Sequence, residues 1–387
     1  MLTICLLILI GYYLQKPVVA LVDKLKSVES NGLKAWENYV LGLDGTEPTA
    51  KVKVDSVQGG TTVMPVVNTL TVQPVDTGFK VEYSLDKVSD STSAATVEAA
   101  GQKQETTDID LDLETATANT TTAYFKMTAT ITKPAVTAQE EDKVVSKVQS
   151  ENTIGVLAVK DAPATAIIGV PWKSLSDGGD IKVDNLVRTA NLTPGDTITV
   201  YDNGKFKQWA LEENEDKTKE WVPVTTVTTG GSEQAGEASE KGVARGAGVW
   251  LTRQKPEEPI YLVGQATSDA ATTTTIEKPT DEEVAAGEKA WNLVASPKVE
   301  PVQVMTILQG KLPNDKVIIP TKGSPKNIYW NKKLNKWGYV DYTTNASGYA
   351  VPTFVEASEA SIPAGTGFWY LNGDANNDEL QWDSDNN

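Results

Sequence analysis

The side chains that could carry out chemistry in this chain are few in kind. Histidine is absent, and the one cysteine, Cys5, lies in an apolar stretch. The chain therefore lacks the commonest general base and metal ligand, every Ser-His or Cys-His nucleophilic pair, intrachain disulfides and thiolate zinc sites. Carboxylates, lysine, serine and tyrosine remain, and no pairing of catalytic groups recurs among them. We predict that the protein is not an enzyme and uses no cofactor.

Two acidic strings have a spacing that could bind calcium. From Asp108 to Glu114, four carboxylates alternate with Ile and Leu, which places them on one face of a strand. A solvated edge that discourages strand-to-strand aggregation explains this string more simply. The second string, Asp374 to Asp378, begins like a calcium loop but has Glu379 where such loops carry glycine. We predict no metal site.

Aromatic residues offer a third chemistry, stacking on sugar rings. Three aromatics near residue 335 have no aromatic counterpart in the upstream copy of the repeat described below, so the shared core does not require them. The other interpretation is a small β core, in which one tryptophan buries roughly 150–250 Å². The candidate glycan platform consists of Tyr329, Trp330, Trp337, Tyr339 and Tyr342.

Length and charge limit the partners. The chain has 387 residues and is 40% hydrophobic, which is enough for two or three domains with substantial cores. Its 52 acidic residues outnumber the 35 basic ones, giving a net charge of -17. A phosphate backbone would repel such a surface. We therefore expect no nucleic-acid partner.

The first 22 residues are almost continuously apolar. A helix that is apolar all round must be buried in lipid or in protein, and Pro17 within it removes one backbone hydrogen bond. Copies of such a helix could bury one another and satisfy the carbonyl that Pro17 frees. We expect an assembly helix over residues 1–30, formed by Leu2, Ile4, Cys5, Leu6, Leu7, Ile8, Leu9, Ile10, Tyr12, Tyr13, Leu14, Pro17, Val18, Val19, Leu21 and Val22.

This pattern resembles the amino-terminal helix of type IV pilins. The resemblance implies a helix that inserts transiently into the membrane and then packs with its copies in a filament core. Cys5 stands where those pilins usually carry Glu, and Pro17 lies a few residues earlier than their proline. Two other interpretations stay open. One is a single-pass anchor of roughly 20 apolar residues in which Lys16 snorkels, and the other is a secretory signal peptide, although no basic residue precedes Lys16.

Residues 31–48, NGLKAWENYVLGLDGTEP, predict a short amphipathic helix and a linker. The apolar residues between Leu33 and Leu43 recur at helical spacing, and Pro48 prevents the helix from continuing. The string resembles a segment that precedes β-domains in large bacterial surface proteins. In that setting Trp36 would anchor the helix beneath the first β-domain.

The remainder of the chain alternates polar and β-branched residues, and turn signals interrupt it every eight to twelve residues. Segments such as KVKVDSV, FKVEYSL and TITVYD predict strands. Helical patterns are nearly absent after Gly45. We expect residues 49–155 to form an immunoglobulin-like β-domain, similar in architecture only, since the span has neither a cysteine pair nor a tryptophan.

A second kind of β-domain occurs twice, over residues 165–267 and 284–387. Many rare residues of the first copy recur 119 positions later, which indicates a tandem duplication. The matched pairs are Trp172 and Trp291, Val183 and Val302, Pro194 and Pro313, Asp196 and Asp315, and Trp250 and Trp369. Where the spacing between the two copies is nine residues longer, four further residues match. They are Tyr201, Asn203, Lys205 and Trp209, which match Tyr329, Asn331, Lys333 and Trp337. We expect the repeated tryptophans to anchor the cores.

Together these observations predict a mainly β protein with a long N-terminal α-helix, an immunoglobulin-like β-sandwich and two duplicated β-domains. We expect a structural subunit of an extracellular, cell-surface, pilus-like filament that polymerises through its N-terminal helix. Its partners would be copies of itself and host or environmental glycans. The alternative is a membrane-anchored surface adhesin or carbohydrate-binding protein.

Overall fold

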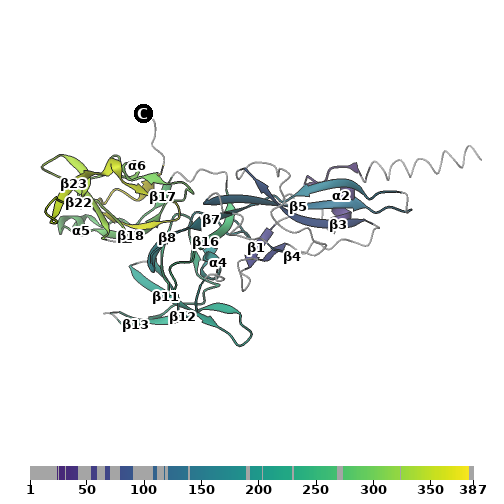
Figure 1. The fold of residues 1–387 in the computed structure, drawn as a ribbon, viewed down its shortest axis with the longest axis horizontal. Coiled ribbons are helices and arrows are strands. Elements are labelled where there is room, and N and C mark those ends of the chain that lie inside the picture. The colour runs from purple at the N-terminus through teal and green to yellow at the C-terminus, as the bar shows by residue number, and fades with distance from the viewer. Residues whose placement is uncertain are drawn as a thin grey trace, which may run out of the picture.

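The structure is a computed structural model that describes residues 24, 26–30, 32–41, 54–58, 66–69, 79–89, 108–110, 117, 121–137, 140–188, 192–202, 204–228, 231–267, 273–322 and 324–382. Within these residues the chain is mainly β and its sheets are antiparallel, which confirms that part of the predicted fold class. Residues 1–23 and 25 of the assembly helix predicted over residues 1–30 lie outside the described residues, and the structure does not show a long N-terminal helix. The molecule is elongated, with residues 32–41 toward one end of its long axis and residues 273–382 toward the other (Figure 1).

The first sheet is built around the long strand β5. Strand β3 pairs with β5 along its whole length, while the other edge of β5 pairs first with β7 and then with β6. The elements of this region are α2 (Ala35–Leu41), β3 (Lys80–Val88), β5 (Thr122–Lys133), β6 (Lys143–Gln149), β7 (Thr153–Val159) and β16 (Ile260–Ala266). A separate small sheet contains β1 (Val54–Gln58), β2 (Val66–Thr69) and β4 (Asp108–Asp110).

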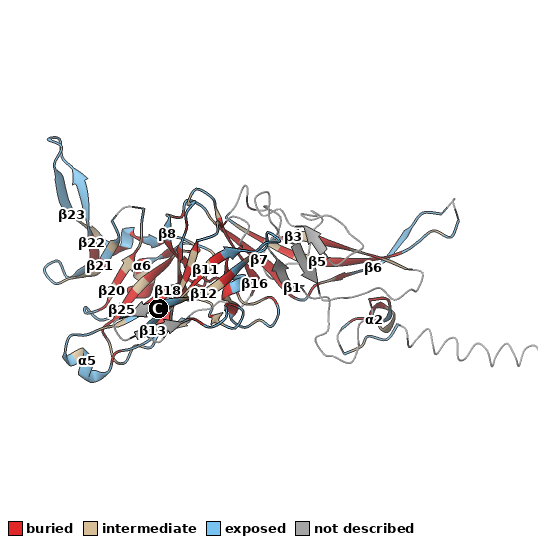
Figure 2. Ribbon diagram, turned by 90° about the horizontal axis from the view of Figure 1, so that it is seen from below, coloured by how far each residue is buried: buried red, intermediate tan, exposed pale blue. Residues whose placement is uncertain are grey.

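The core of the first sheet follows from strand alternation. Phe125, Met127 and Ile131 are separated by even numbers of residues in β5, so they lie on one face of the strand, and all three are fully buried. Helix α2 adds Val40 and Leu41 to this core. The helix lies within the segment that the sequence predicted to be helical, and Figure 2 shows it on the side of the sheet where β6 lies.

Two similar modules follow, which we call module 1 (residues 153–267) and module 2 (residues 273–382). Besides β7 and β16, module 1 contains β8 (Thr165–Gly169), β9 (Ile181–Lys182), α4 (Val183–Leu186), β10 (Thr197–Asp202), β11 (Lys205–Glu213), β12 (Lys219–Thr228), β13 (Gly231–Gln234), β14 (Gly242–Val243) and β15 (Gly248–Thr252). Its main sheet has the order β13-β12-β11-β10-β15-β8, and β14 pairs with β9.

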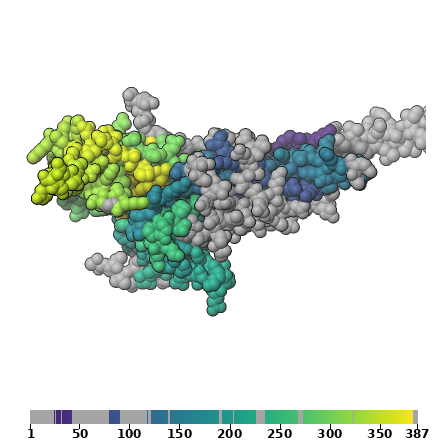
Figure 3. Space-filling view, viewed as in Figure 1, coloured from purple at the N-terminus to yellow at the C-terminus, as the bar shows by residue number. Residues whose placement is uncertain are grey.

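Module 2 repeats this arrangement with the sheet order β23-β22-β21-β20-β25-β18 and the pair β24-β19. In Figure 3 the two modules are neighbouring lobes, module 2 in yellow and module 1 in teal and green. The elements of module 2 are β17 (Thr273–Thr275), α5 (Asp281–Ala285), β18 (Ala290–Ala295), β19 (Val302–Gln303), α6 (Val304–Leu308), β20 (Lys316–Ile319), β21 (Lys326–Asn331), β22 (Lys336–Thr344), β23 (Ala350–Glu356), η2 (Ala357–Glu359), β24 (Ser361–Ile362), β25 (Gly367–Asn372) and β26 (Glu379–Gln381).

The strand registers of the two modules agree. Across β10 and β15 Trp250 pairs with Thr199, and across β20 and β25 Trp369 pairs with Ile318, which lies 119 residues after Thr199. The buried aspartates that directly precede β10 and β20 accept equivalent hydrogen bonds. Asp196 Oδ1 accepts a 2.8 Å hydrogen bond from the backbone N–H of Gln254, and Asp315 Oδ1 accepts one of 2.8 Å from the backbone N–H of Gly373.

The structure corrects the sequence match between Trp172 and Trp291. Trp172 follows β8, is buried, and donates from Nε1 to the carbonyl oxygen of Leu262 at 3.1 Å. Trp291 lies within β18, at a position that Thr165 occupies in β8, and is 46% exposed. The connection between the first and second strands of the module is shorter in module 2, so a constant spacing misaligns this part of the repeat.

The match between Trp209 and Trp337 is also corrected. Trp209 lies in β11 beside Ile198, whereas Trp337 lies one strand further out, in β22 beside Trp330. The counterpart of Trp337 is Trp221, which pairs with Leu211 as Trp337 pairs with Trp330. The slip of nine residues arises because similar turn residues occur in two different hairpins, β10–β11 and β21–β22.

Candidate functional site

The assembly residues predicted from the sequence, Leu2 to Val22, lie outside the described residues. Among the helices that the structure does describe, none has the length and apolar character needed to cross a membrane. The predicted acidic strings are described in part. Asp108 and Asp110 belong to β4, and Asp374 Oδ1 accepts a 2.9 Å hydrogen bond from the backbone N–H of Asn376, which forms a turn. No group of three candidate metal ligands occurs in the described part of the chain.

The five aromatics of the predicted glycan platform do not share an exposed face. Trp337 and Tyr339 are 7% and 5% exposed and belong to the core of module 2, and Trp330 packs on Trp337 with ring centroids 5.5 Å apart. Tyr329, one residue along, packs instead against Phe354. Tyr342 is exposed near the tip of the β22–β23 hairpin. Strand alternation separates these residues, because neighbours in a strand point to opposite faces.

A different aromatic cluster lies where the two modules meet, and we call it the inter-module aromatic cluster. Its centre is the pair Trp250 and Trp369, with ring centroids 6.0 Å apart and planes at 73°. Trp291 lies 5.5 Å from Trp369, and Phe206 lies 6.3 Å from both central tryptophans. Trp291 is 46% exposed and Phe206 36%. The members of the cluster are Tyr201, Phe206, Trp250, Trp291 and Trp369.

Strand alternation also places this cluster. Val249 and Leu251 are fully buried in module 1, so Trp250 between them must point to the opposite face of β15. Phe368 and Tyr370 impose the same direction on Trp369. The sequence identified both tryptophans as duplicated but assigned them to the cores. The strings VWL and FWY contain the signal that places both tryptophans outside the cores, because each tryptophan stands between two core residues of one strand.

Backbone hydrogen bonds join the modules reciprocally beneath the cluster. The N–H of Gly169 donates to the carbonyl oxygen of Gly365, and the N–H of Ala295 donates to that of Gly246, both at 2.8 Å. Gly169 and Ala295 are equivalent positions, as are Gly246 and Gly365, so each module gives the other the same contact. The two modules therefore meet about an approximate two-fold axis, and the inter-module aromatic cluster lies beside it.

The exposed rings of the cluster offer flat apolar surfaces on which a ligand can stack. Its rings meet edge to face, the geometry that the aromatic quadrupole favours. Burial raises the pKa of Tyr201, and the negative charge of Glu277 raises it further, so the phenol stays neutral and can donate a hydrogen bond at physiological pH. An apolar cavity of about 560 Å³ also lies between the modules, lined by Ala166, Ile168, Ile319 and Pro363 among others.

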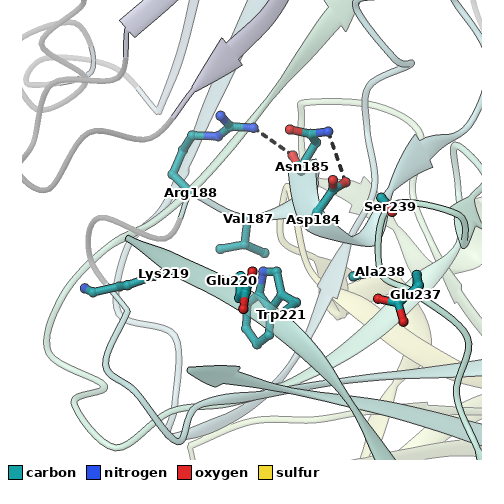
Figure 4. Close-up of a pocket in the computed structure, with 10 residues that line it drawn as sticks. All are labelled: Asp184, Asn185, Val187, Arg188, Lys219, Glu220, Trp221, Glu237, Ala238 and Ser239. Atoms are coloured by element: carbon teal, nitrogen blue, oxygen red, sulfur yellow. Dashed lines mark hydrogen bonds between the residues drawn. The ribbon is translucent and has the colours of Figure 1, made fainter. Parts of the chain in front are cut away.

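A separate pocket of about 340 Å³ lies entirely within module 1. Its floor is formed by buried residues that include Arg188 and Trp221, and its rim carries exposed polar side chains from α4, β12 and the connection before β14. Figure 4 shows the residues that line it: Asp184, Asn185, Val187, Arg188, Lys219, Glu220, Trp221, Glu237, Ala238 and Ser239.

Two buried hydrogen-bond donors beside this pocket lack acceptors among the described residues. Arg188 is 6% exposed and donates from Nη2 to the carbonyl oxygen of Asn185 at 2.8 Å, but its Nε has no partner among the described residues. Trp221 is 5% exposed, and its Nε1 is also without a partner in that part of the chain. Burial lowers the pKa of Arg188 to about 10, against the opposing attraction of the Asp184 carboxylate. No sequence pattern indicates this pocket, because neither Arg188 nor Trp221 belongs to a recognisable motif.

Comparison with known proteins yields no relative. No protein family model matches the chain. No curated protein and no solved structure matches it either. The function is therefore inferred from the sequence and from the geometry described above.

Proposed function

We propose that the protein is a structural subunit of an extracellular, pilus-like filament at the cell surface. The apolar residues between Leu2 and Val22 form a helix that inserts transiently into the membrane and then packs with copies of itself. The rest of the chain, an immunoglobulin-like sandwich and two duplicated β-domains, is displayed outward. Burial contributes roughly 1.5–3 kcal/mol per apolar side chain, so a helix of this composition has a large driving force for self-association.

The position of α2 is the observation that carries this proposal. Helix α2 packs at one end of the elongated body and module 2 forms the other end (Figure 1). The chain is held firmly there, because Glu37 Oε1 accepts a 2.8 Å hydrogen bond from Ser146 Oγ of β6 and Trp36 packs 6.3 Å from Phe79. A helix that precedes α2 would thus leave the body at one end. This arrangement is compatible with a filament that has the helices at its centre and the modules on its surface.

The charge of the body supports the same proposal. The net charge of -17 makes neighbouring subunits repel one another through their outer surfaces. Cohesion must then come from an apolar element, and the N-terminal segment is the longest apolar stretch in the sequence. The acidic coat would keep the resulting fibre soluble.

Negative-stain electron microscopy tests the proposal. The purified full chain should form fibres of uniform width after the detergent is removed, without added lipid. A variant that lacks residues 1–23 should stay monomeric under the same conditions. Particles of the full chain that remain single, or fibres formed equally well by the truncated variant, would refute the filament function.

A surface adhesin that binds carbohydrate is the second candidate, and the inter-module aromatic cluster favours it. Trp291 and Phe206 leave ring surface open to solvent at a junction that both modules build. A glycan array would test this function with the full chain and with Trp291→Ala. Binding by the full chain that Trp291→Ala abolishes supports the adhesin, whereas an array without signal contradicts it.

A further inference from the structure

A chain of polar side chains runs outward from the core of module 2. Asp315 and Tyr370 are 1% and 0% exposed, and the phenol of Tyr370 donates to Asp315 Oδ2 at 2.7 Å. Asn377 Nδ2 donates to the same phenol oxygen at 3.3 Å, and Lys311 Nζ donates to Asn377 Oδ1 at 2.6 Å. The carboxamide of Asn377 therefore lies between an amine on one side and a phenol backed by a carboxyl group on the other.

Both Lys311 and Asn377 are held in place. The backbone N–H of Lys311 donates to the carbonyl oxygen of Leu308 at 3.1 Å, and its Nζ donates to that of Glu379 at 2.9 Å. The carbonyl oxygen of Asn377 accepts a 2.6 Å hydrogen bond from Asn372 Nδ2. Because Cγ of Asn377 is bonded to Oδ1 at about 1.2 Å, Lys311 Nζ lies within about 3.8 Å of that carbon. Two groups held this close can react without a separate encounter.

The surroundings favour the uncharged forms of these groups. Burial lowers the pKa of Lys311, and the carboxylates of nearby Asp315, Asp374 and Glu379 act against this shift without cancelling it. A desolvated lysine amine is a nucleophile. Burial raises the pKa of Asp315 and that of Tyr370. The network can therefore present a neutral amine to one side of the carboxamide and a proton to the other.

We propose that Lys311 and Asn377 form an isopeptide bond within module 2. Lys311 Nζ attacks Cγ of Asn377, and the bond from Cγ to Nδ2 breaks. Nδ2 keeps its two hydrogens, gains a proton from the phenol of Tyr370 and leaves as ammonia. Tyr370 takes a proton from the Asp315 carboxyl, and the carboxylate is protonated again by the proton that the amine loses as the amide forms. The step needs no oxidant, reductant or further reactant.

Module 1 keeps the buried aspartate but lacks this network. Leu192 stands 119 positions before Lys311 and is buried. Leu251 stands 119 positions before Tyr370 and is also buried. The strand registers show that Leu251 and Tyr370 are equivalent positions. Module 1 thus forms the same sheet with an apolar pair, so packing alone does not require the amine and the phenol of module 2.

The bond would fasten the last strand of module 2. Lys311 follows α6, Asn377 precedes β26, and α6 packs against β26. Among the described strands, β26 pairs only with the three-residue strand β17. A covalent bond between Lys311 and Asn377 would keep β26 next to α6 when that short pairing opens.

This inference depends on neither proposed function. Filament formation depends on residues 2–22, and the adhesin candidate depends on the inter-module aromatic cluster. Neither region contains a member of the network, so the bond can be present or absent whichever of those functions is right.

Intact mass spectrometry of the full chain, purified in detergent, tests the inference. The parent should be lighter than its sequence by one molecule of ammonia, and a protease digest should contain one branched peptide that joins residues 311 and 377. Lys311→Arg, which keeps the charge, and Asn377→Ala should both have their full mass. A parent of full mass would overturn the inference. It would also be overturned if Lys311→Arg lacked the same ammonia, because the loss would then come from another reaction, such as the cyclisation of an asparagine.

Two further variants test the geometry. Burial also lowers the pKa of Lys289, which lies near Asp315, but its Nζ donates to the backbone carbonyl oxygen of Asn314 and not to a side-chain amide. Lys289→Arg should therefore stay lighter by one ammonia, and a full mass would contradict the assignment of the amine to Lys311.

Tyr370→Phe removes the group that protonates the leaving nitrogen. It should slow bond formation about a hundredfold, so that freshly purified protein is mostly of full mass, while near-UV circular dichroism shows that it is folded. A Tyr370→Phe variant that is linked as completely as the parent would overturn the proton transfer through the phenol.

Discussion

Module 1 and module 2 have the same sheet order and the same registers, yet they use them differently. In both, a buried aspartate, Asp196 or Asp315, accepts a hydrogen bond from the backbone just after the strand that carries the central tryptophan. The modules differ after the short helix, where module 1 buries Arg188 and module 2 exposes Gln309. The modules thus share the hydrogen bond that their buried aspartates accept, while the residue after the short helix differs between them.

The modules also differ in what their last strand joins. Strand β16 of module 1 pairs with β7, which continues through β5 into the first sheet. Strand β26 of module 2 pairs only with the three-residue strand β17 among the described strands. The last strand of module 1 therefore connects that module to the first sheet, whereas the equivalent strand of module 2 pairs only within module 2 among the described strands.

The largest expected effect separates the two tryptophans that the sequence matched. Trp172→Ala should lower the free energy of unfolding by about 3–5 kcal/mol, because the ring is buried. Its centroid lies 6.1 Å from that of Tyr124, and it packs so closely on Gly155 that a Cβ added there would lie 2.7 Å from the ring. Trp291→Ala should cost about 1 kcal/mol or less, since the side chain is 46% exposed. Denaturant unfolding of both variants measures the difference. Equal losses would mean that the two residues occupy equivalent places after all.

A smaller effect is expected at the glycines of the reciprocal contact. Gly365 has a φ of 68°, and a Cβ there would lie 2.6 Å from Cγ2 of Val159, while Gly246 has a φ of 87° and would meet Oγ1 of Thr274 at 2.5 Å. Each change to alanine should destabilise by about 2–3 kcal/mol from the positive φ and the close contact.

Gly348 is the matched control for these two glycines. Its φ is 81°, but nothing lies within 4 Å of the Cβ that alanine would add. Gly348→Ala should therefore cost only the backbone term of about 1 kcal/mol. Thermal unfolding of the three variants compares them. If Gly365→Ala and Gly246→Ala lose no more stability than the control, the modules do not pack as described.

The smallest effects are changes in pH dependence with opposite sign. Hydrogen bonding from Lys241, with help from Lys207, holds the pKa of Asp202 below its ordinary value. Its stabilising contribution is present above the unfolded pKa and is lost as the pH falls through the folded pKa. Asp202→Asn should therefore cost stability at pH 7, by up to about 1 kcal/mol for a partly exposed pair, and the difference from the parent should shrink on acidification.

Asp315 should behave in the opposite way. Burial raises the pKa of its carboxyl, although Tyr370 and the backbone of Gly373 donate to it. Because the folded pKa is above the unfolded one, the parent loses stability as the pH rises between the two values. The cost of Asp315→Asn should then be larger at acidic pH than at pH 7. Urea unfolding at several pH values checks both signs, and parallel curves for the parent and a variant would disprove the assignment for that residue.

The sequence was most informative where a pattern depends on one strand alone. Alternation in FKVEYSL and TITVYD predicted strands that the structure contains as β3 and β10, and the helical spacing around Trp36 predicted α2. The repeat could be seen because Asp196, Trp250 and their counterparts lie in the part of the module whose length did not change.

The sequence was least informative about contacts between elements. The inter-module aromatic cluster depends on how two modules pack, which no spacing along the chain encodes. Arg188 follows a four-residue helix, and nothing near it in the sequence indicates burial. The predicted glycan platform ignored alternation, since Trp337 and Tyr339 share a face that points into the core. Each of these features depends on tertiary packing rather than on local pattern.

Pyrene labelling of Cys5 tests the central claim, that the apolar N-terminal helices pack with one another, most directly. Cys5 is the only cysteine in the chain and lies within the segment that we propose to form the assembly helix, so the label reports on that segment alone. When detergent is removed from the labelled full chain, excimer emission should rise together with fibre formation, and unlabelled chain should dilute it. Fibres that form with monomer emission only would contradict the claim.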